Sequence, residues 1–433
     1  MTIVSSFQRF LQVFLLAMHE PTARVFSDLV TGWLFAPGRS LADRIRAASI
    51  RHSASAYYRV LASGCWSLEE VGLRLLKLLH RSSDTLFLVG DDTFVAHKGS
   101  KVFGTGMHRD GCLSTRTRTI KRWGHAWVVL SVLKESRRQP GRYYALPVLV
   151  RLYLSEGTAR KLGRKYRKKT ELLIEMLRRM DAELPDQKLH FLGDYGYTAP
   201  AVLAQFPRRI AVTGRAHAKA RLHAPAPARH AGRGRPAVRG QRLDSPQELL
   251  ANRALYREFQ VTAERSYRVR MASIEGCFFQ LPDRLVQVVV LKHVGQRRED
   301  DVFYSTEVAA ADEQIVRWYA RRWSIEVTFR DAKQHLGLGR ERNRTCAAAR
   351  RTAPVGFLLY SLIVCWYENV PTAAVRSLRD YPQKRQASFA DMLAALRRES
   401  LREHRKKYFA ASPFPADLQK TLDYLEKLIL LAA

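Results

Sequence analysis

The sequence lacks the cysteine patterns that zinc modules and disulfide-rich domains use. It has only five cysteines, an odd number, and none of them stands in a CxxC or similar spacing. A zinc site or a disulfide framework is therefore not expected, and the reducing environment of the cytoplasm fits this cysteine usage.

Long hydrophobic runs are also missing. The longest strongly apolar run, residues 354–367, is too short to span a bilayer comfortably. The apolar stretch at residues 10–18 follows Arg9, but Gln12 interrupts it and no small-x-small cleavage site follows. We therefore expect a buried helix there and not a signal peptide, and we expect no membrane partner.

Acidic residues are in short supply. The chain has 73 Lys and Arg against 40 Asp and Glu, so its formal net charge is +33 and its pI is near 10.4. The electrostatic field of a protein with this net charge attracts polyanions. Nucleic acid is the first candidate, because each phosphate that the protein neutralises releases counterions. An anionic membrane surface is the rival partner. It is disfavoured because the positive charge is spread over the whole chain and not concentrated in one amphipathic helix.

Residues 1–80 have the pattern of helices and are predicted to form a helical DNA-binding domain. Ser40 and Ser53 stand where the N-caps of two short helices would lie. Two short helices separated by a tight break are typical of a helix-turn-helix, whose second helix faces DNA. The candidates for this contact are Ser55, Tyr57 and Arg59. A plain helical bundle explains the same pattern equally well.

From residue 85 the pattern changes to strands. Apolar, β-branched and aromatic runs cover residues 85–96, 124–134 and 143–154. A long basic helix is expected over residues 155–180, followed by two further strands at residues 188–197 and 209–215 with a short helix between them. This order predicts an α/β fold with a ribonuclease H-like mixed sheet. The catalytic core would occupy residues 85–217 and 306–375.

Residues 218–305 are expected to form a basic loop and a β-rich insertion. The loop contains Arg233-Gly234-Arg235-Pro236, the core of an AT-hook, in which an extended Arg-Gly-Arg lies in a narrow minor groove. A generic basic linker explains these residues as well. Strand patterns return over residues 258–306. The last region, residues 376–433, is predicted to be helical and to serve dimerisation or DNA contact.

Two aspartates share an unusual setting. Asp92 lies near the end of one apolar strand, and Asp194 ends another. An acid that follows apolar strand residues is costly unless it is compensated, and a divalent cation provides such compensation. Carboxylate oxygens suit Mg²⁺ or Mn²⁺, and two such ions can activate the attacking oxygen and stabilise the leaving oxygen of a phosphoryl transfer. Asp91 competes with its neighbour for the same role.

A third acid, Glu326, is predicted to lie on a helix. Tyr319, Arg322, Glu326 and Lys333 fall within roughly 60° of one another at about 100° per residue, so they would share one face. A carboxylate framed by cations suits a metal ion with a phosphate beside it. Taken alone, this face is better explained as a solvated charged surface with i,i+4 pairs. The two strand-end aspartates change that balance.

The spacing Tyr-x2-Arg-x3-Glu-x6-Lys at residues 319–333 resembles the signature of DDE-type transposases of bacterial insertion sequences. The DDT at residues 91–93 resembles the first-acid motif of these proteins, and the GDYGY at residues 193–197 resembles the second. The organisation of residues 85–370 is similar as well, including the β-rich insertion before the glutamate helix.

This resemblance implies a set of site residues. The implied metal ligands, for two Mg²⁺ or Mn²⁺ ions, are Asp92, Asp194 and Glu326. The implied DNA contacts near the cleaved end are Tyr319, Arg322 and Lys333. Some members flip a base onto a Trp of the insertion, but residues 218–317 contain no Trp, so we assign no hairpin step. Structural or phosphate-contact roles are favoured for His97, His108 and His125 over a general-base role.

The function implied is that of a DNA transposase acting as a homodimer in the cytoplasm, associated with the bacterial nucleoid. It would bind the terminal inverted repeats of its element, hydrolyse phosphodiesters at the ends and join the 3′-hydroxyls to target DNA. A metal-dependent nuclease without strand transfer and a domesticated DNA-binding regulator are the alternatives. A basic RNA-binding protein would leave the spaced carboxylates without a purpose.

Overall fold

The structure is a computed structural model, and it places most of the chain in two compact units. Unit 1 comprises Met1–His80, Asp92–Lys168 and Ser324–Ala433, and unit 2 comprises Arg81–Asp91 and Lys169–Trp323. The residues described are 3–36, 40–48, 51–80, 85–111, 113–115, 117–227, 236–252, 255–261, 267–293, 299–371 and 386–409. Each unit is described in turn.

Unit 1 begins with short amphipathic helices, as predicted. They are α1 (Ser5–Leu15), α2 (Glu20–Phe35), α3 (Leu41–Ala47), α4 (Ala54–Ala62) and α5 (Leu68–Leu79). Ser40 caps α3 in a capping box with Asp43, which satisfies two backbone N–H groups at the helix start. Ser53 precedes α4 without a side-chain cap bond.

The predicted outward position of Tyr57 is wrong. Tyr57 is buried, together with Val60 and Leu61 one turn further along α4. Residues three and four positions apart share a helix face, so the apolar stripe of α4 takes Tyr57 into the core. Ser55 and Arg59, the other two candidates, are exposed.

The strands of unit 1 are the end of β1 (Leu86–Ala96), β2 (Gly106–Arg109), β3 (Lys121–Glu135) and β4 (Tyr143–Tyr153). β3 and β4 form a long antiparallel pair in which Ala126 lies opposite Tyr153. Helices α12 (Ser324–His335) and α13 (Cys346–Asn369) pack on β4, and the Thr328 hydroxyl of α12 donates to the Ala145 carbonyl at 2.8 Å.

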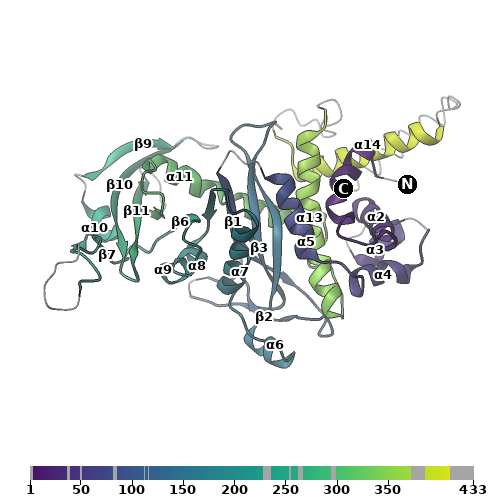
Figure 1. Ribbon diagram of the computed structural model, residues 1–433, viewed down its shortest axis with the longest axis horizontal. Coiled ribbons are helices and arrows are strands. Elements are labelled where there is room, and N and C mark those ends of the chain that lie inside the picture. Colours follow the sequence, from purple (N-terminus) through teal and green to yellow (C-terminus); the bar gives the residue numbers. More distant parts are fainter. Residues whose placement is uncertain are drawn as a thin grey trace. The chain divides into compact units, whose positions relative to one another are not determined.

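The apolar run at residues 354–367 lies within α13 and is buried. It is therefore the central core helix of unit 1, with α14 (Phe389–Phe409) packed against it (Figure 1). Among the described residues, no helix is long and apolar enough to cross a membrane. The predicted buried helix near the N-terminus is α1, whose Phe7, Leu11 and Phe14 are fully covered.

The prediction of one long basic helix over residues 155–180 is wrong. The chain forms α6 (Glu156–Lys161) in unit 1 and α7 (Lys169–Glu183) in unit 2. Gly163 ends α6 with a positive φ of 62°, and the next N–H, that of Arg164, donates to the Ala159 carbonyl at 2.8 Å. A left-handed glycine with this bond is a common helix stop, and it outweighs the helix-forming Lys and Arg around it.

Unit 2 contains the parallel part of the sheet. The first half of β1 pairs in parallel with β5 (Leu189–Leu192), and β5 pairs in parallel with β6 (Ala211–Arg215). β12 (Asp301–Ser305) then lies antiparallel to β6 and leads into the predicted insertion (Figure 1). The mixed α/β fold expected from the sequence, with helical regions at both ends of the chain, is confirmed.

The β-rich insertion of unit 2 is built on a curved antiparallel layer. Its strands and helix are β7 (Leu222–His223), β8 (Arg242–Leu243), α10 (Pro246–Ala251), β9 (Arg257–Val261), β10 (Tyr267–Phe278) and β11 (Leu281–His293). β10 pairs with β9, β11 and β7, and β11 pairs with β12. Within the strand region predicted over residues 258–306, residues 277–281 form the end of β10, the turn and the start of β11.

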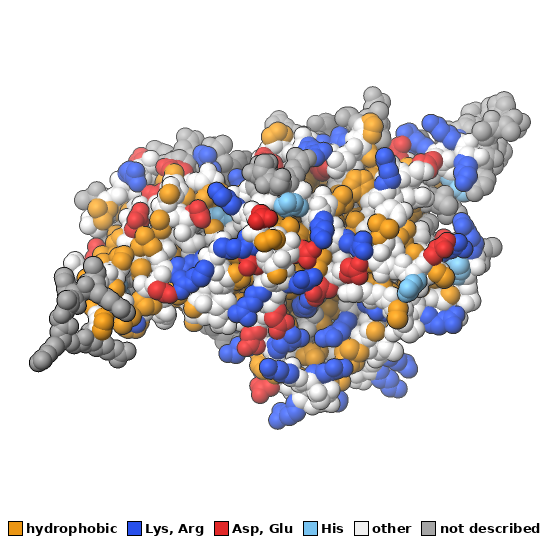
Figure 2. Space-filling model, viewed as in Figure 1, with side chains coloured by type: hydrophobic (Ala, Val, Ile, Leu, Met, Phe, Trp, Pro, Cys, Tyr) orange, Lys and Arg blue, Asp and Glu red, His pale blue; other side chains and the backbone are white. Residues whose placement is uncertain are grey.

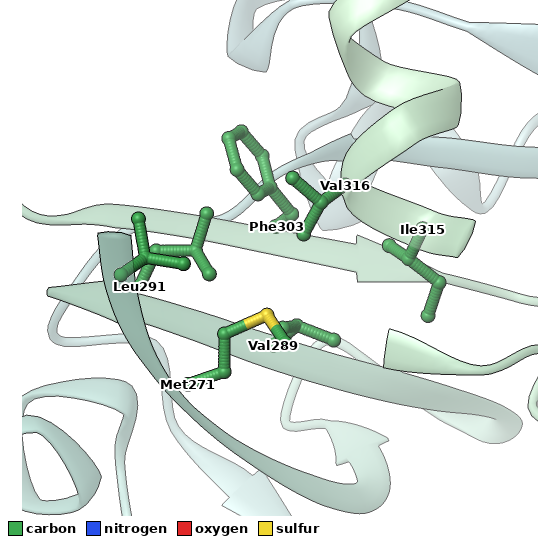
Figure 3. Close-up of a cluster of buried hydrophobic side chains, with 7 residues drawn as sticks. Met271, Val289, Leu291, Phe303, Ile315 and Val316 are labelled. Carbon is green, nitrogen blue, oxygen red and sulfur yellow. The ribbon is translucent and has the colours of Figure 1, made fainter. Parts of the chain in front are cut away.

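Helix α11 (Asp312–Arg321) covers this layer with an apolar face (Figure 3). Its Ile315 and Val316 pack against Met271, Val289 and Phe303 of the strands. Burying such side chains contributes roughly 1.5–3 kcal/mol each, so the cluster firmly seats the helix that carries Tyr319.

The segment with the Tyr-Arg-Glu-Lys spacing is two helices and not one. α11 ends at Arg321 and α12 begins at Ser324. At the junction the Arg322 N–H donates to the Tyr319 carbonyl and the Trp323 N–H donates to the Ala320 carbonyl. These i→i−3 bonds tighten the turn and interrupt the α-helical ladder. Tyr319 and Arg322 therefore belong to unit 2, whereas Glu326 and Lys333 belong to unit 1.

Candidate active site

Asp194 lies immediately beyond the C-terminal end of β5, as predicted. It caps the short helix α8 (Tyr195–Thr198), and its Oδ1 accepts a hydrogen bond from the Tyr197 N–H at 3.2 Å. The preceding Gly193 allows the tight approach, because a β-carbon there would lie 2.7 Å from the Phe191 ring and 2.8 Å from Thr198. The GDYGY motif thus fixes a half-buried carboxylate at the edge of the parallel strands.

Asp91 and Arg322 form an ion pair in unit 2. Arg322 Nη1 lies 3.2 Å from Asp91 Oδ2, and the two side chains are only 12% and 18% exposed. Little solvent separates these charges, so the pair is held more firmly than an ordinary surface salt bridge. Arg322 of the signature is therefore oriented by an acid of the DDT motif.

Tyr319 lies beside this pair. Its ring packs on Phe303 with centroids 4.4 Å apart, and the Arg322 guanidinium carbon is 5.7 Å from its ring centre. Burial raises the pKa of the Tyr319 hydroxyl, Arg322 and Arg215 lower it, and Asp194 raises it. Tyr319, Arg322 and Asp194 therefore form one electrostatic cluster within unit 2.

Asp91 and Asp92 project to opposite sides of β1, because successive strand residues alternate. Phe87, two alternations before Asp91, lies 5.8 Å from Trp318 of α11, so this side of the strand carries the α11 contacts. Trp318 thus has a packing role. The charge of Asp92 affects a different residue, Tyr153 of unit 1. Burial raises the pKa of the Tyr153 hydroxyl, and the negative charge of Asp92 raises it further.

Glu326 and Lys333 lie on α12 in unit 1. Glu326 is in the first turn and Lys333 in the last, and both side chains are half-buried. Seven residues make nearly two full turns, so the two side chains lie on the same side of the helix. This part of the predicted shared face is retained. A carboxylate in the first helical turn and a cation in the last also complement the helix dipole.

The donor set fits a hard divalent cation, because Asp92, Asp194 and Glu326 offer only carboxylate oxygens. Within the parts of the chain that the structure describes, no three His, Cys, Asp or Glu side chains are grouped closely enough to hold a metal ion. Asp92 and Glu326 belong to unit 1, and Asp194 belongs to unit 2.

The three histidines after the first acid lie in unit 1. The His97 and His125 rings are 4.5 Å apart, and His125 Nε2 lies 2.8 Å from the Phe103 carbonyl, to which it donates as the N–H tautomer. Burial lowers the pKa of both rings to about 4. His108 is buried beside Phe94 and Tyr153. Neutral, enclosed rings of this kind fit a structural role, one of the two roles that the sequence favoured.

Acidification is expected to destabilise unit 1 through this pair. The unfolded rings titrate near 6.5, so the unfolded state binds more protons and stability falls as the pH drops from 6.5 towards 4. For His125 alone the loss between pH 6.5 and 5 is about 1.5 kcal/mol. Thermal melting at pH 7, 6 and 5 should show the decline, and His125→Gln should make it shallower because the contribution of one of the two rings is removed. An unchanged pH profile in that variant would contradict this assignment.

Positive charge gathers at one place in unit 1. Figure 2 shows Lys and Arg side chains crowded over α6 and the segment after it. The exposed members are Arg160, Lys161, Arg164, Lys165 and Lys168.

The proposed minor-groove arginines, Arg233 and Arg235, lie outside the described residues. No disulfide links the cysteines within the described part of the chain.

Two residues of the cluster were not assigned to it from the sequence. Arg215 ends β6 and contributes charge at Tyr319, and Phe303 of β12 provides the ring on which Tyr319 packs. Neither has a motif around it. The order β6-β12 in the sheet brings them together, and pairing across such sequence distance leaves no local pattern.

Comparison with known proteins bears on this arrangement. Residues 13–274 match the family described as DDE superfamily endonuclease, and residues 246–366 match archaeal putative transposase ISC1217. No curated protein matches the chain. The first match spans more than half of the sequence and includes Asp92 and Asp194, while the second includes Glu326. The resemblance to DDE transposases is thereby confirmed, and the chain belongs to the DDE superfamily of endonucleases.

Proposed function

We propose that the protein is an insertion-sequence transposase that cuts DNA at the terminal inverted repeats of its element and joins the 3′-ends to target DNA. One observation carries the proposal. Tyr319 and Arg322 of the signature share an electrostatic cluster with Asp194, the acid of the GDYGY motif. An active site for phosphoryl transfer needs acids and phosphate-binding cations side by side, and an ordinary charged helix face does not provide this.

The roles of the side chains follow from their chemistry. Asp92, Asp194 and Glu326 would hold two Mg²⁺ or Mn²⁺ ions, which when bound supply Lewis-acid chemistry at the scissile phosphate. Arg322 offers a planar fork of N–H donors to phosphate oxygens, and Lys333 offers a mobile point charge. Tyr319 would contact the same DNA strand. Asp91 orients Arg322 through their ion pair, so we assign it a positioning role.

The proposal has two further parts, a homodimer and an end-binding region. A homodimer would bridge two transposon ends, because each active site acts on one end. The helices of residues 1–80 would bind the repeats, and the alternative of a plain helical scaffold predicts that deleting their exposed basic side chains leaves repeat binding intact.

A strand-transfer assay tests the proposal. The full chain is expected to cut a DNA fragment that carries the inverted repeats flanking its own gene, and to join the ends to a supercoiled plasmid. Both steps should require Mg²⁺ or Mn²⁺ and should stop when EDTA is added. Joined products are detected as linearised or relaxed plasmid that carries the labelled end.

The outcomes separate the candidates. Cleavage without joining, even when fragments with free 3′-hydroxyls are supplied, would identify a nuclease of the same fold. Repeat binding without cleavage under either metal would identify a DNA-binding regulator. The absence of binding to any DNA duplex would refute all three assignments.

A further inference from the structure

The insertion of unit 2 carries an aromatic ring held between two arginines. The guanidinium carbons of Arg221 and Arg239 each lie 3.8 Å from the centre of the Phe279 ring. Arg221 directly precedes β7, Arg239 lies shortly before β8, and Phe279 follows β10 (Figure 1). Strand pairing of β7 with both β8 and β10 brings these three segments together.

The two guanidinium groups lie on opposite faces of the ring. An approach to 3.8 Å from the centre is open only above or below the ring, because carbon and hydrogen atoms occupy its plane to that distance. Two guanidinium groups at 3.8 Å on one face would occupy the same volume. The arrangement is therefore an Arg-Phe-Arg sandwich, in which each cation faces the electron-rich side of the ring.

Backbone contacts hold the sandwich in place. Arg239 Nε donates to the Phe279 carbonyl at 3.0 Å, and the Phe279 N–H donates to the Arg221 carbonyl, also at 3.0 Å. The His223 ring lies 5.6 Å from Phe279. The two guanidinium groups are consequently positioned before any ligand arrives, so a ligand loses less side-chain entropy on binding them.

Arg221 and Arg239 also differ from other arginines of unit 2 in their ion pairing. Eight other arginines of unit 2 pair with carboxylates: Arg179 with Glu183, Arg208 with Asp283, Arg209 with Asp181, Arg215 with Asp301, Arg242 with Glu248, Arg257 with Asp312, Arg270 with Glu258 and Arg322 with Asp91. Among the described residues, no carboxylate forms a salt bridge with Arg221 or Arg239. Stacking covers one face of each guanidinium group, and apart from Arg239 Nε, which bonds the Phe279 carbonyl, the N–H edges remain for an anion.

We propose that this sandwich, defined as Arg221, Phe279 and Arg239, is a docking site for the phosphate backbone of a DNA duplex. Two fixed guanidinium forks on either side of one ring suit two phosphates of a nucleic-acid strand, whose charges recur along the backbone. Such contacts position DNA and carry no sequence information. The inference rests on the proposed function, because it assigns a further DNA contact to the same protein.

Duplex affinity measured in EDTA tests the site without involving catalysis. The probe is a fluorescein-labelled linear duplex of mixed sequence, titrated with the full chain at several salt concentrations. Arg221→Ala and Arg239→Ala should each weaken binding about three- to tenfold and lower the slope of log K against log salt by about 1. Phe279→Leu keeps both charges but removes the stacking surface, so affinity should fall while the slope changes less.

Arg208→Ala is the matched control. It removes one exposed arginine from the same unit, but this arginine is already neutralised by Asp283, so its salt slope should stay at the wild-type value. Circular dichroism and thermal melting confirm that the variants are folded. If both sandwich variants bind the duplex like Arg208→Ala, the docking site is refuted while the proposed function stands. If the wild-type chain itself fails to bind the duplex, the proposed function is what fails.

Discussion

Asp194→Asn is expected to reduce metal-dependent strand cleavage by on the order of 10³-fold or more, while duplex affinity stays within about twofold. The change keeps the size of the side chain and its ability to accept the cap bond from the Tyr197 N–H, so α8 should stay in place. It removes the negative charge that a divalent cation requires. Cleavage of an end-labelled repeat fragment in Mg²⁺ measures the first quantity, and fluorescence anisotropy in EDTA measures the second.

Glu326→Gln is the companion to this variant and should give the same separation of cleavage from binding. Asp283→Asn is the control, because this aspartate is 60% exposed and its carboxylate pairs with Arg208 at the surface of unit 2. It should cleave like the wild type. Wild-type cleavage by Asp194→Asn or by Glu326→Gln would remove that residue from the proposed metal site.

The second prediction is that the neighbouring aspartates Asp91 and Asp92 differ in how their substitution lowers DNA cleavage. Asp92→Asn should abolish cleavage to the same extent as Asp194→Asn, because Asp92 is proposed as a metal ligand. Asp91→Asn should instead act through Arg322: without its carboxylate partner the guanidinium loses its orientation. We expect cleavage to fall by roughly 10- to 100-fold, mainly through weaker engagement of the DNA end.

A double-mutant cycle makes this distinction sharp. If Asp91 acts only by holding Arg322, the Asp91→Asn/Arg322→Gln protein should be no less active than Arg322→Gln alone. The metal dependence provides a second readout, since raising the Mg²⁺ concentration should leave the Asp91→Asn defect unchanged. Should Asp91→Asn abolish cleavage and Asp92→Asn have little effect, the two assignments must be exchanged.

The sequence predicted the core of this protein well because its signals are local. Strand runs at residues 124–134 and 143–154 are β-branched and aromatic, and β3 and β4 form there. The insertion before the glutamate helix was found for the same reason. Boundaries were less predictable where one residue outweighs its neighbours: Gly163 ends α6 inside a stretch of good helix formers, and i→i−3 bonds at Arg322 divide the signature helix.

Part of the candidate site was accessible in the same way. Motif spacing pointed to Tyr319, Arg322 and Asp194, and the structure places these three in one cluster. Tyr57 was misplaced because its aromatic ring and hydroxyl suit both a core and a DNA contact, and only the packing of α4 distinguishes them. The partners of the cluster, Arg215 and Phe303, come from strands far apart in the sequence.

Composition, strand and helix periodicity and motif spacing are properties of short segments, and they sufficed to indicate a basic DDE-type protein with three candidate acids. Which aspartate of the DDT motif meets Arg322, and which arginines enclose Phe279, depended on the alternation of β1 and on pairings between distant strands. Such choices follow from sheet register and packing, because side chains far apart in the sequence meet only when the strands between them are assembled.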